Sequence, residues 1–72
     1  MGQIATITIT AETYRVRVTV NKLNVRSGPS SNNVIVTQVK QNEVYTIVEE
    51  KEGWGKLKSG VGWLDLQYTQ RI

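Results

Sequence analysis

The side chains that most often carry catalysis are missing from this sequence of 72 residues. It contains no Cys, so it offers no thiolate as a nucleophile or metal ligand, and no His, the commonest general base. Glu49, Glu50 and Glu52 lie close together, but a glycosidase needs two carboxyl groups across a cleft, roughly 5 to 9.5 Å apart. Acidic neighbours in a hairpin loop project into solvent instead. We therefore expect no enzyme, no catalytic residue, no metal and no cofactor.

Chemistry of a binding kind is centred on Trp54, in the run Gly-Trp-Gly-Lys-Leu at 53–57. If Leu57 points into a core, strand alternation places Trp54, Lys56 and Lys58 together on the opposite face. An outward indole beside two cations can stack on a sugar or peptide and attract an anionic group. The alternative is structural, with Trp54 covering the open end of a barrel under the loop at 27–33.

Alternation of apolar and polar residues with a period of two dominates the sequence, and helical periodicity is absent. From Tyr14 to Val20 it indicates a strand with one wet face, and its parity changes at Asn21-Lys22, which predicts a bulge or tight turn. Five or six short strands about ten residues apart predict an all-β fold, a small barrel or sandwich. The other strand-like runs are 23–26, 34–39, 44–48, 54–57 and 62–64, and the predicted connections are 27–33, 40–42, 49–53 and 59–60.

Residues 1–13 precede this pattern and form either an N-terminal extension or an extra edge strand. Within them, Ile4–Thr10 is rich in Ile and Thr and carries no charge. Because an uncharged edge strand is prone to pair with other chains, we expect something to cover it. The candidates are its own barrel, a neighbouring domain, or a second copy of the chain in a dimer.

Motifs in a fixed order connect this sequence to a known family. The octad Leu23–Ser30 (Leu-Asn-Val-Arg-Ser-Gly-Pro-Ser) comes first, the Gly-Trp-Gly-Lys-Leu run at 53–57 follows, then Gly62-Trp63-Leu64 and, near the end, Tyr68. In this order and at this spacing they resemble the signature, the Gly-Trp-x-Lys-aliphatic strand, the Gly-aromatic-aliphatic strand and the late Tyr of bacterial Src-homology-3 (SH3) domains. The resemblance runs from about Tyr14 to Tyr68.

One residue and one short segment depart from the family pattern. Asn42 stands where the family commonly has Gly, and Asn tolerates the left-handed backbone conformation best after Gly. Asp65-Leu66-Gln67 replaces the usual small polar residues before the late Tyr, which affects the shape of the groove. The resemblance implies an all-β, half-open, SH3-like barrel of five to six strands over residues 14–72.

The resemblance also implies that Trp54 and Tyr68 line one groove beside the loop at 27–33. Arg26 and Asn24 are candidates to face a ligand carboxylate, although Arg26 could instead hold a structural corner. Trp63 shares a strand face with Asp65 and should be partly exposed, whereas packing is the favoured role of Tyr45. The predicted ligand-binding residues are Trp54, Tyr68, Lys56, Asn24, Arg26 and Trp63.

Charge and family together indicate the partners. The net charge of +3, from nine Lys and Arg against six Asp and Glu, favours anionic partners without selecting one. Members of the family mostly sit beside wall hydrolases (amidases, lysozyme-like enzymes and phage endolysins) and tether them to peptidoglycan. The resemblance thus implies a non-catalytic module that binds a stem peptide, cross-bridge or glycan of the wall, outside the cell, as part of a larger protein.

Other functions remain open at this stage. A protein-interaction module that binds peptide segments through the same groove is the main alternative. Nucleic-acid binding is disfavoured, because the charge excess is small and not clustered. No run approaches the length of a membrane span, and no secretion signal is recognised at the start of the chain.

Overall fold

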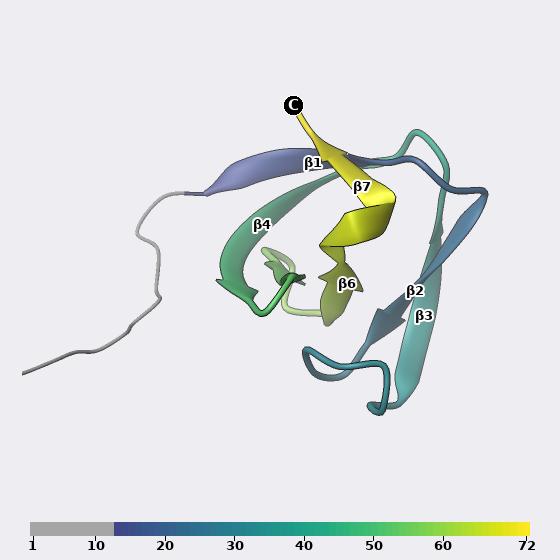
Figure 1. The fold of residues 1–72 in the computed structure, drawn as a ribbon, viewed down its shortest axis with the longest axis vertical. Coiled ribbons are helices and arrows are strands. Elements are labelled where there is room, and N and C mark those ends of the chain that lie inside the picture. The colour runs from purple at the N-terminus through teal and green to yellow at the C-terminus, as the bar shows by residue number, and fades with distance from the viewer. Residues whose placement is uncertain (1–12) are drawn as a thin grey trace, which may run out of the picture.

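The computed structural model describes residues 13–72, which form an all-β fold without an α-helix in that range (Figure 1). One short 3-10 helix, η1 (Leu66–Tyr68), interrupts the strands near the C-terminal end. The strands are β1 (Tyr14–Val18), β2 (Lys22–Arg26), β3 (Ile35–Lys40), β4 (Val44–Lys51), β5 (Trp54–Leu57), β6 (Trp63–Asp65) and β7 (Thr69–Arg71).

The strands make one antiparallel sheet in the order β3-β2-β6-β5-β4-β1-β7. The sheet curls so that β2 and β3 stand across from β4, but β3 and β7 remain at its edges and the barrel does not close (Figure 1). The predicted half-open SH3-like fold is confirmed. The described residues contain seven strands rather than five or six, because β7 (Thr-Gln-Arg) contains no apolar residue and so shows no alternation.

The core is a single apolar cluster on the concave side of this sheet. Strand alternation fills it: in β1, β2 and β5, every second residue is buried. No polar or charged residue in the described range is buried with it, so burial there carries no penalty for unpaired polar groups. The buried side chains are Val16, Val18, Leu23, Val25, Val39, Ile47, Leu57 and Leu64.

Tight turns use residues that tolerate positive φ. Asn42, between β3 and β4, has φ of 73°, so the expectation that Asn replaces Gly in a left-handed position is confirmed. Lys51 pairs with Trp54 across a turn of two residues, Glu52 and Gly53, with φ of 50° and 87°. Positive φ at both central residues is the pattern of a type I′ hairpin, whose twist suits the flanking strands.

The strand ends differ slightly from the predicted ones. β1 ends at Val18, two residues earlier than the alternation suggested, and a bend at Val20-Asn21 leads into β2, so the parity change is a turn. β4 continues to Lys51, through residues predicted as a loop, because it pairs with β5 along that stretch.

The predicted extension or edge strand at 1–13 falls, apart from Thr13, outside the described residues. In the part of the chain that the structure describes, no helix is long and apolar enough to cross a membrane.

Candidate ligand-binding groove

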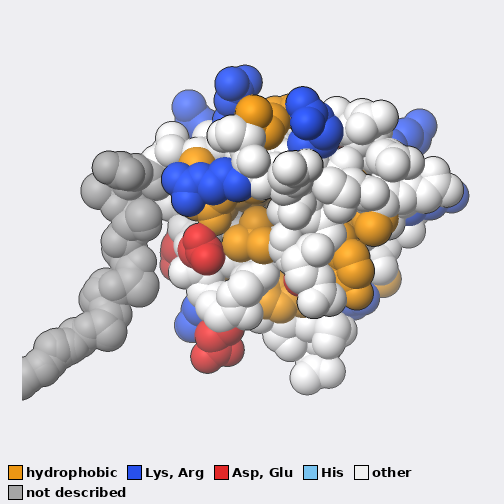
Figure 2. Space-filling view, turned by 45° about the horizontal axis from the view of Figure 1, so that its top comes forward, with side chains coloured by type: hydrophobic (Ala, Val, Ile, Leu, Met, Phe, Trp, Pro, Cys, Tyr) orange, Lys and Arg blue, Asp and Glu red, His pale blue; other side chains and the backbone are white. Residues whose placement is uncertain are grey.

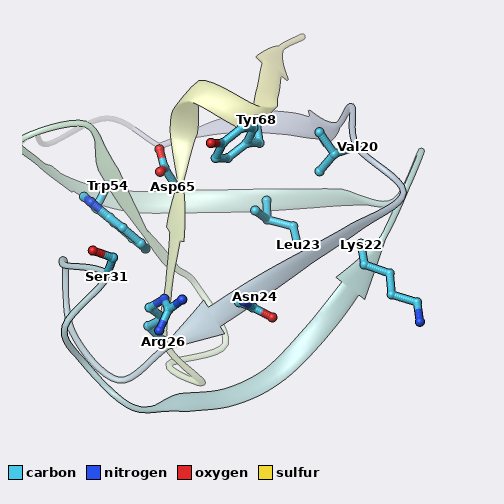
Figure 3. A pocket seen from close by; sticks show the side chains of 9 residues that line it. All are labelled: Val20, Lys22, Leu23, Asn24, Arg26, Ser31, Trp54, Asp65 and Tyr68. Carbon is cyan, nitrogen blue, oxygen red and sulfur yellow. The ribbon is translucent and has the colours of Figure 1, made fainter.

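A shallow hollow of about 360 Å³ lies between β2 and the segment that joins β6 to β7. Figure 3 shows the two sides of this groove, with Trp54, Asp65 and Tyr68 along one side. The other side comes from β2, the residues around it and the loop that follows it: Val20, Lys22, Leu23, Asn24, Arg26 and Ser31.

The groove exists because β2 and β6 pair at only one position and then separate. Among residues 13–72, their ladder has a single pair, Arg26 with Trp63. Gly62 permits this contact, since a Cβ there would lie 2.5 Å from the carbonyl oxygen of Arg26. Continuing the same register would set Asn24 opposite Asp65, but no pair forms there, and both side chains line the groove instead. The open part of the barrel thus becomes the hollow that these side chains line.

Trp54 is placed by the alternation of β5. Gly55 and Leu57 are buried, while Trp54 and Lys56 are half-buried on the other face, as predicted. Gly55 leaves room for Leu66, because a Cβ on Gly55 would lie 2.8 Å from Cδ2 of Leu66. The indole of Trp54 therefore borders the groove instead of filling the core. Gly55 and Leu57 of the same strand are the residues that face the core.

Tyr68 is held in place through its backbone. Its carbonyl oxygen accepts two hydrogen bonds from Thr19, one from the backbone N–H at 3.0 Å and one from Oγ1 at 2.9 Å. The side chain is 40% exposed and lines the groove. An exposed ring on an anchored backbone is suited to aromatic contact with a ligand.

Asp65 sits at the start of η1 and organises it. Its Oδ1 accepts a hydrogen bond from the backbone N–H of Gln67 at 3.1 Å, and the N–H of Leu66 donates to the carbonyl of Gly53 at 2.9 Å. The departure from the family pattern at 65–67 therefore caps a 3-10 turn and adds a carboxylate to the groove.

Arg26 has a structural contact as well as a place in the groove. Its Nη1 donates a hydrogen bond to the carbonyl of Asn33 at 3.0 Å, which ties the end of β2 to the end of the loop. The backbone N–H of Ser27 donates to the carbonyl of Val34 at 2.9 Å and closes the same loop. The guanidinium has five N–H donors, so this contact leaves others to face a ligand.

Asn24 lies between Arg26 and Lys22 on the same face of β2. Its Oδ1 accepts a hydrogen bond from Nε2 of Gln38 on β3 at 2.8 Å. This bond fixes the orientation of the side-chain amide, whose N–H donors remain for a ligand.

Two predicted residues, Lys56 and Trp63, lie outside the groove. Arg26, Trp63 and Lys56 are direct cross-strand neighbours on β2, β6 and β5, and Lys56 faces Glu49 on β4. This row marks the closed part of the sheet. The structure therefore brings together four of the six predicted residues, and Trp63 is half-buried, as its strand face suggested.

The sequence analysis did not select Lys22, Leu23, Val20, Ser31 or Asp65 as groove residues. Asp65 had a usable signal, since it stands two residues after Trp63 and so shares its strand face. Lys22 likewise shares the face of Asn24 and Arg26. Ser31 had none, because its position depends on how the loop folds back.

The tyrosines outside the groove form hydrogen bonds to carboxylates. Tyr45 packs against the core, as predicted, and its hydroxyl donates to Oε1 of Glu43 at 2.7 Å. Tyr14 donates to Oε1 of Glu50 at 2.6 Å, and the guanidinium of Arg71 lies 4.0 Å from the centre of its ring. Burial, followed by the hydrogen bond to the carboxylate, raises the pKa of each phenol to about 12. The contacts of Tyr14 join β1 to β4 and β7.

Metal-binding geometry is not found in the described range, where no group of three or more acidic side chains could hold an ion. Two further hollows, along β3 and between β4 and the end of β5, contain no aromatic side chain except Tyr45. The groove beside Trp54 is therefore the candidate site.

Comparison with known proteins gives one match. The sequence model of the bacterial SH3 domain family matches residues 21–70, which include β2 to β6 and all nine groove residues but Val20. No curated protein and no solved structure matches the chain.

Proposed function

This chain belongs to the bacterial SH3 domain family, and from that membership we propose that it binds peptidoglycan and targets an attached wall hydrolase to its substrate. Domains of this family are binding modules, often for the cell wall or for other proteins, and are not themselves catalytic. Of these two kinds of partner, we propose the cell wall as the ligand of the groove.

The observation that carries the proposal is an aromatic groove with cations on one side. Trp54 and Tyr68 offer ring faces for stacking, and Arg26 and Lys22 offer charge to the carboxylates of a wall peptide. Asn24 supplies amide donors. We assign ligand contact to Trp54, Tyr68, Asn24 and Arg26, and not to Lys56 or Trp63.

The groove is shallow, so its affinity for one wall unit should be weak. Weak binding suffices for targeting, because the wall repeats its epitope densely and linked modules gain from effective concentration. The ligand would be a stem peptide, a cross-bridge or a glycan segment. The protein would act outside the cell, at the wall, as part of a larger chain with an amidase, lysozyme-like or endolysin domain.

Charge distribution favours this proposal over nucleic-acid binding. On the face in Figure 2, Lys and Arg side chains lie in several separate places, with apolar and acidic side chains between them. Sequence-independent nucleic-acid binding uses a continuous basic stripe along the backbone of its ligand.

Sedimentation with sacculi stripped of accessory polymers tests the proposal. Fluorescently tagged protein should co-sediment saturably, and Tyr68→Ala should reduce the bound fraction. Tyr45→Phe, which keeps the packing and lies outside the groove, is the control and should bind like wild type. Lack of co-sedimentation by the wild type would refute the proposal, and specific binding to peptides without binding to sacculi would instead support a protein-interaction module.

A further inference from the structure

We infer that the groove selects a ligand with a free amino group, and that Asp65 is the residue that selects it. The inference rests on the proposed function for the kind of ligand, a wall peptide, and on the geometry around Asp65 for the chemical group. The sequence analysis placed Asp65 on the strand face of Trp63 and among the departures from the family pattern, but did not make it a ligand-binding residue.

Strand register places the carboxylate beside the indole. Trp54 and Asp65 are direct partners in the β5–β6 ladder, so their Cβ atoms lie about 4.5–5.5 Å apart and their side chains project from the same face. An ammonium group that contacts the ring of Trp54 is therefore within reach of the carboxylate of Asp65.

The 3-10 turn adds the second ring. Asp65 is the N-cap of η1 and Tyr68 is its last residue, so this one short turn carries both side chains to the groove. Figure 3 shows Asp65 beside Trp54, with Tyr68 on the same side of the groove. Two ring faces and a carboxylate thus converge on one end of the groove.

Such a trio is suited to an ammonium ion. Aromatic faces attract cations through the ring quadrupole, and a charge-assisted hydrogen bond to a carboxylate is about twice as strong as a neutral one. Within residues 13–72, Oδ1 of Asp65 is engaged by the N–H of Gln67. This bond holds the carboxyl group in position and leaves Oδ2 for a ligand.

The opposite side of the groove has the opposite charge. Arg26 pairs with Trp63, two residues before Asp65 on β6, so Arg26 and Asp65 are diagonal neighbours with backbones about 7–8 Å apart. That separation corresponds to about two residues of extended peptide. The groove would therefore hold a dipolar peptide segment, with its amine at Asp65 and a carboxylate at Arg26.

Two sources of the amine are distinguishable: the side chain of a diamino acid and the N-terminus of a cross-bridge. The probes are acetyl-Ala-Lys-Ala for the first and Ala-Ala-Ala for the second, each with its amine-acetylated counterpart, titrated by backbone NMR shifts. Wild type should bind at least one free-amine peptide about tenfold more tightly than the acetylated form. Whichever peptide shows this difference identifies the source.

Asp65→Asn and Glu49→Gln form a matched pair. Both remove one negative charge, but Glu49 lies outside the groove, and Asn at 65 still caps the turn. Asp65→Asn should abolish the preference for the free amine, whereas Glu49→Gln should retain it. Equal affinity of the wild type for free and acetylated peptides, or no binding of either free-amine peptide, would overturn the inference.

Acetylated sacculi separate this inference from the proposed function. If sacculi bind equally well before and after acetylation of their amines, the wall-binding proposal stands and the amine selection fails. If the free-amine peptides bind with the expected preference but sacculi do not, the wall-binding proposal fails and the assignment of Asp65 stands.

Discussion

Trp54 and Trp63 provide a comparison that isolates the groove from the fold. Both are half-buried tryptophans on the same face of neighbouring strands. Only Trp54 lines the groove. We predict that Trp54→Ala weakens binding to sacculi much more than Trp63→Ala does, while both lower stability to a similar extent.

The expected magnitudes separate the two effects. Replacing a fully buried Trp by Ala costs about 3–5 kcal/mol, so a half-buried one should cost roughly 2 kcal/mol. A domain of this size has a free energy of unfolding of roughly 4–11 kcal/mol. Even the lower value leaves about 2 kcal/mol, which keeps about 97% of the variant folded. Unfolding therefore cannot account for a large loss of binding.

Loss of the contact between Trp54 and the ligand changes the measured Kd much more than the loss of stability does. An indole that covers on the order of 50 Å² of ligand surface contributes about 1.3 kcal/mol at ~25 cal/mol per Å². This corresponds to about a tenfold increase in Kd for Trp54→Ala.

The assay is a binding isotherm on purified sacculi for wild type and both variants, with urea denaturation of each. Equal increases in Kd for the two variants, or a loss of binding by Trp54→Ala that matches its loss of folded protein, would show that Trp54 only covers the barrel end.

Three further predictions concern the fold and its electrostatics. Gly62→Ala should lower the free energy of unfolding by roughly 1–3 kcal/mol in urea, because the added Cβ meets the backbone of Arg26; wild-type stability would contradict the close approach. Glu50→Gln should bring the pKa of Tyr14 below about 12, because the carboxylate of Glu50 stabilises the protonated phenol. A pH titration monitored by phenolate absorbance measures this change. A raised phenol pKa stabilises the fold below pH 10, and this contribution is lost as the pH rises through about 12. If Glu50→Gln left the titration of Tyr14 unchanged, the assigned role of Glu50 would be wrong. Leu64→Ala removes a side chain with 0% exposure and should lower the free energy of unfolding by about 2–5 kcal/mol in the same urea assay; an unchanged free energy of unfolding would contradict its place in the core.

Local rules in the sequence account for most of the fold. Alternation identified six strands, and the parity change at Asn21-Lys22 identified the turn between β1 and β2. Asn42 identified a left-handed turn residue. Alternation could not show that β4 extends to Lys51, because residues 49–51 are all charged. They form part of the strand because they pair with β5. Pairing partners are a property of the tertiary structure.

The site was predictable in part, for a physical reason. Alternation specifies which face of a strand a residue occupies, and it placed Trp54 and Lys56 correctly on the outer face of β5. It does not specify where along that face the sheet opens. The groove begins one step beyond the pair of Arg26 and Trp63, so Lys56 and Trp63 share the face of the site but lie in its closed part. Tyr68 came from the family resemblance alone.

We predict that ligand binding opposes the separation of β2 from β6, because the groove lies at the open junction between them. The hairpin of β2 and β3 joins the rest of the sheet through the pair of Arg26 and Trp63. It also packs Leu23, Val25 and Val39 into the core, so its separation opens the core as well as the groove. A ligand that touches Asn24 on one side and Trp54 on the other must oppose that separation. At a concentration of 100 times Kd, it should stabilise the joined state by about 2.7 kcal/mol.

Hydrogen exchange tests this coupling directly. Saturating ligand, in the form of whichever probe peptide binds, should slow the exchange of the amides of Arg26 and Trp63 by up to about a hundredfold. The amides of the β1–β4 ladder, such as those in the pair of Arg15 and Thr46, lie outside the groove and should slow less. Equal protection of both ladders at conditions where their unliganded rates differ would mean that the ligand does not bridge β2 and β6, and the groove would then not be the site.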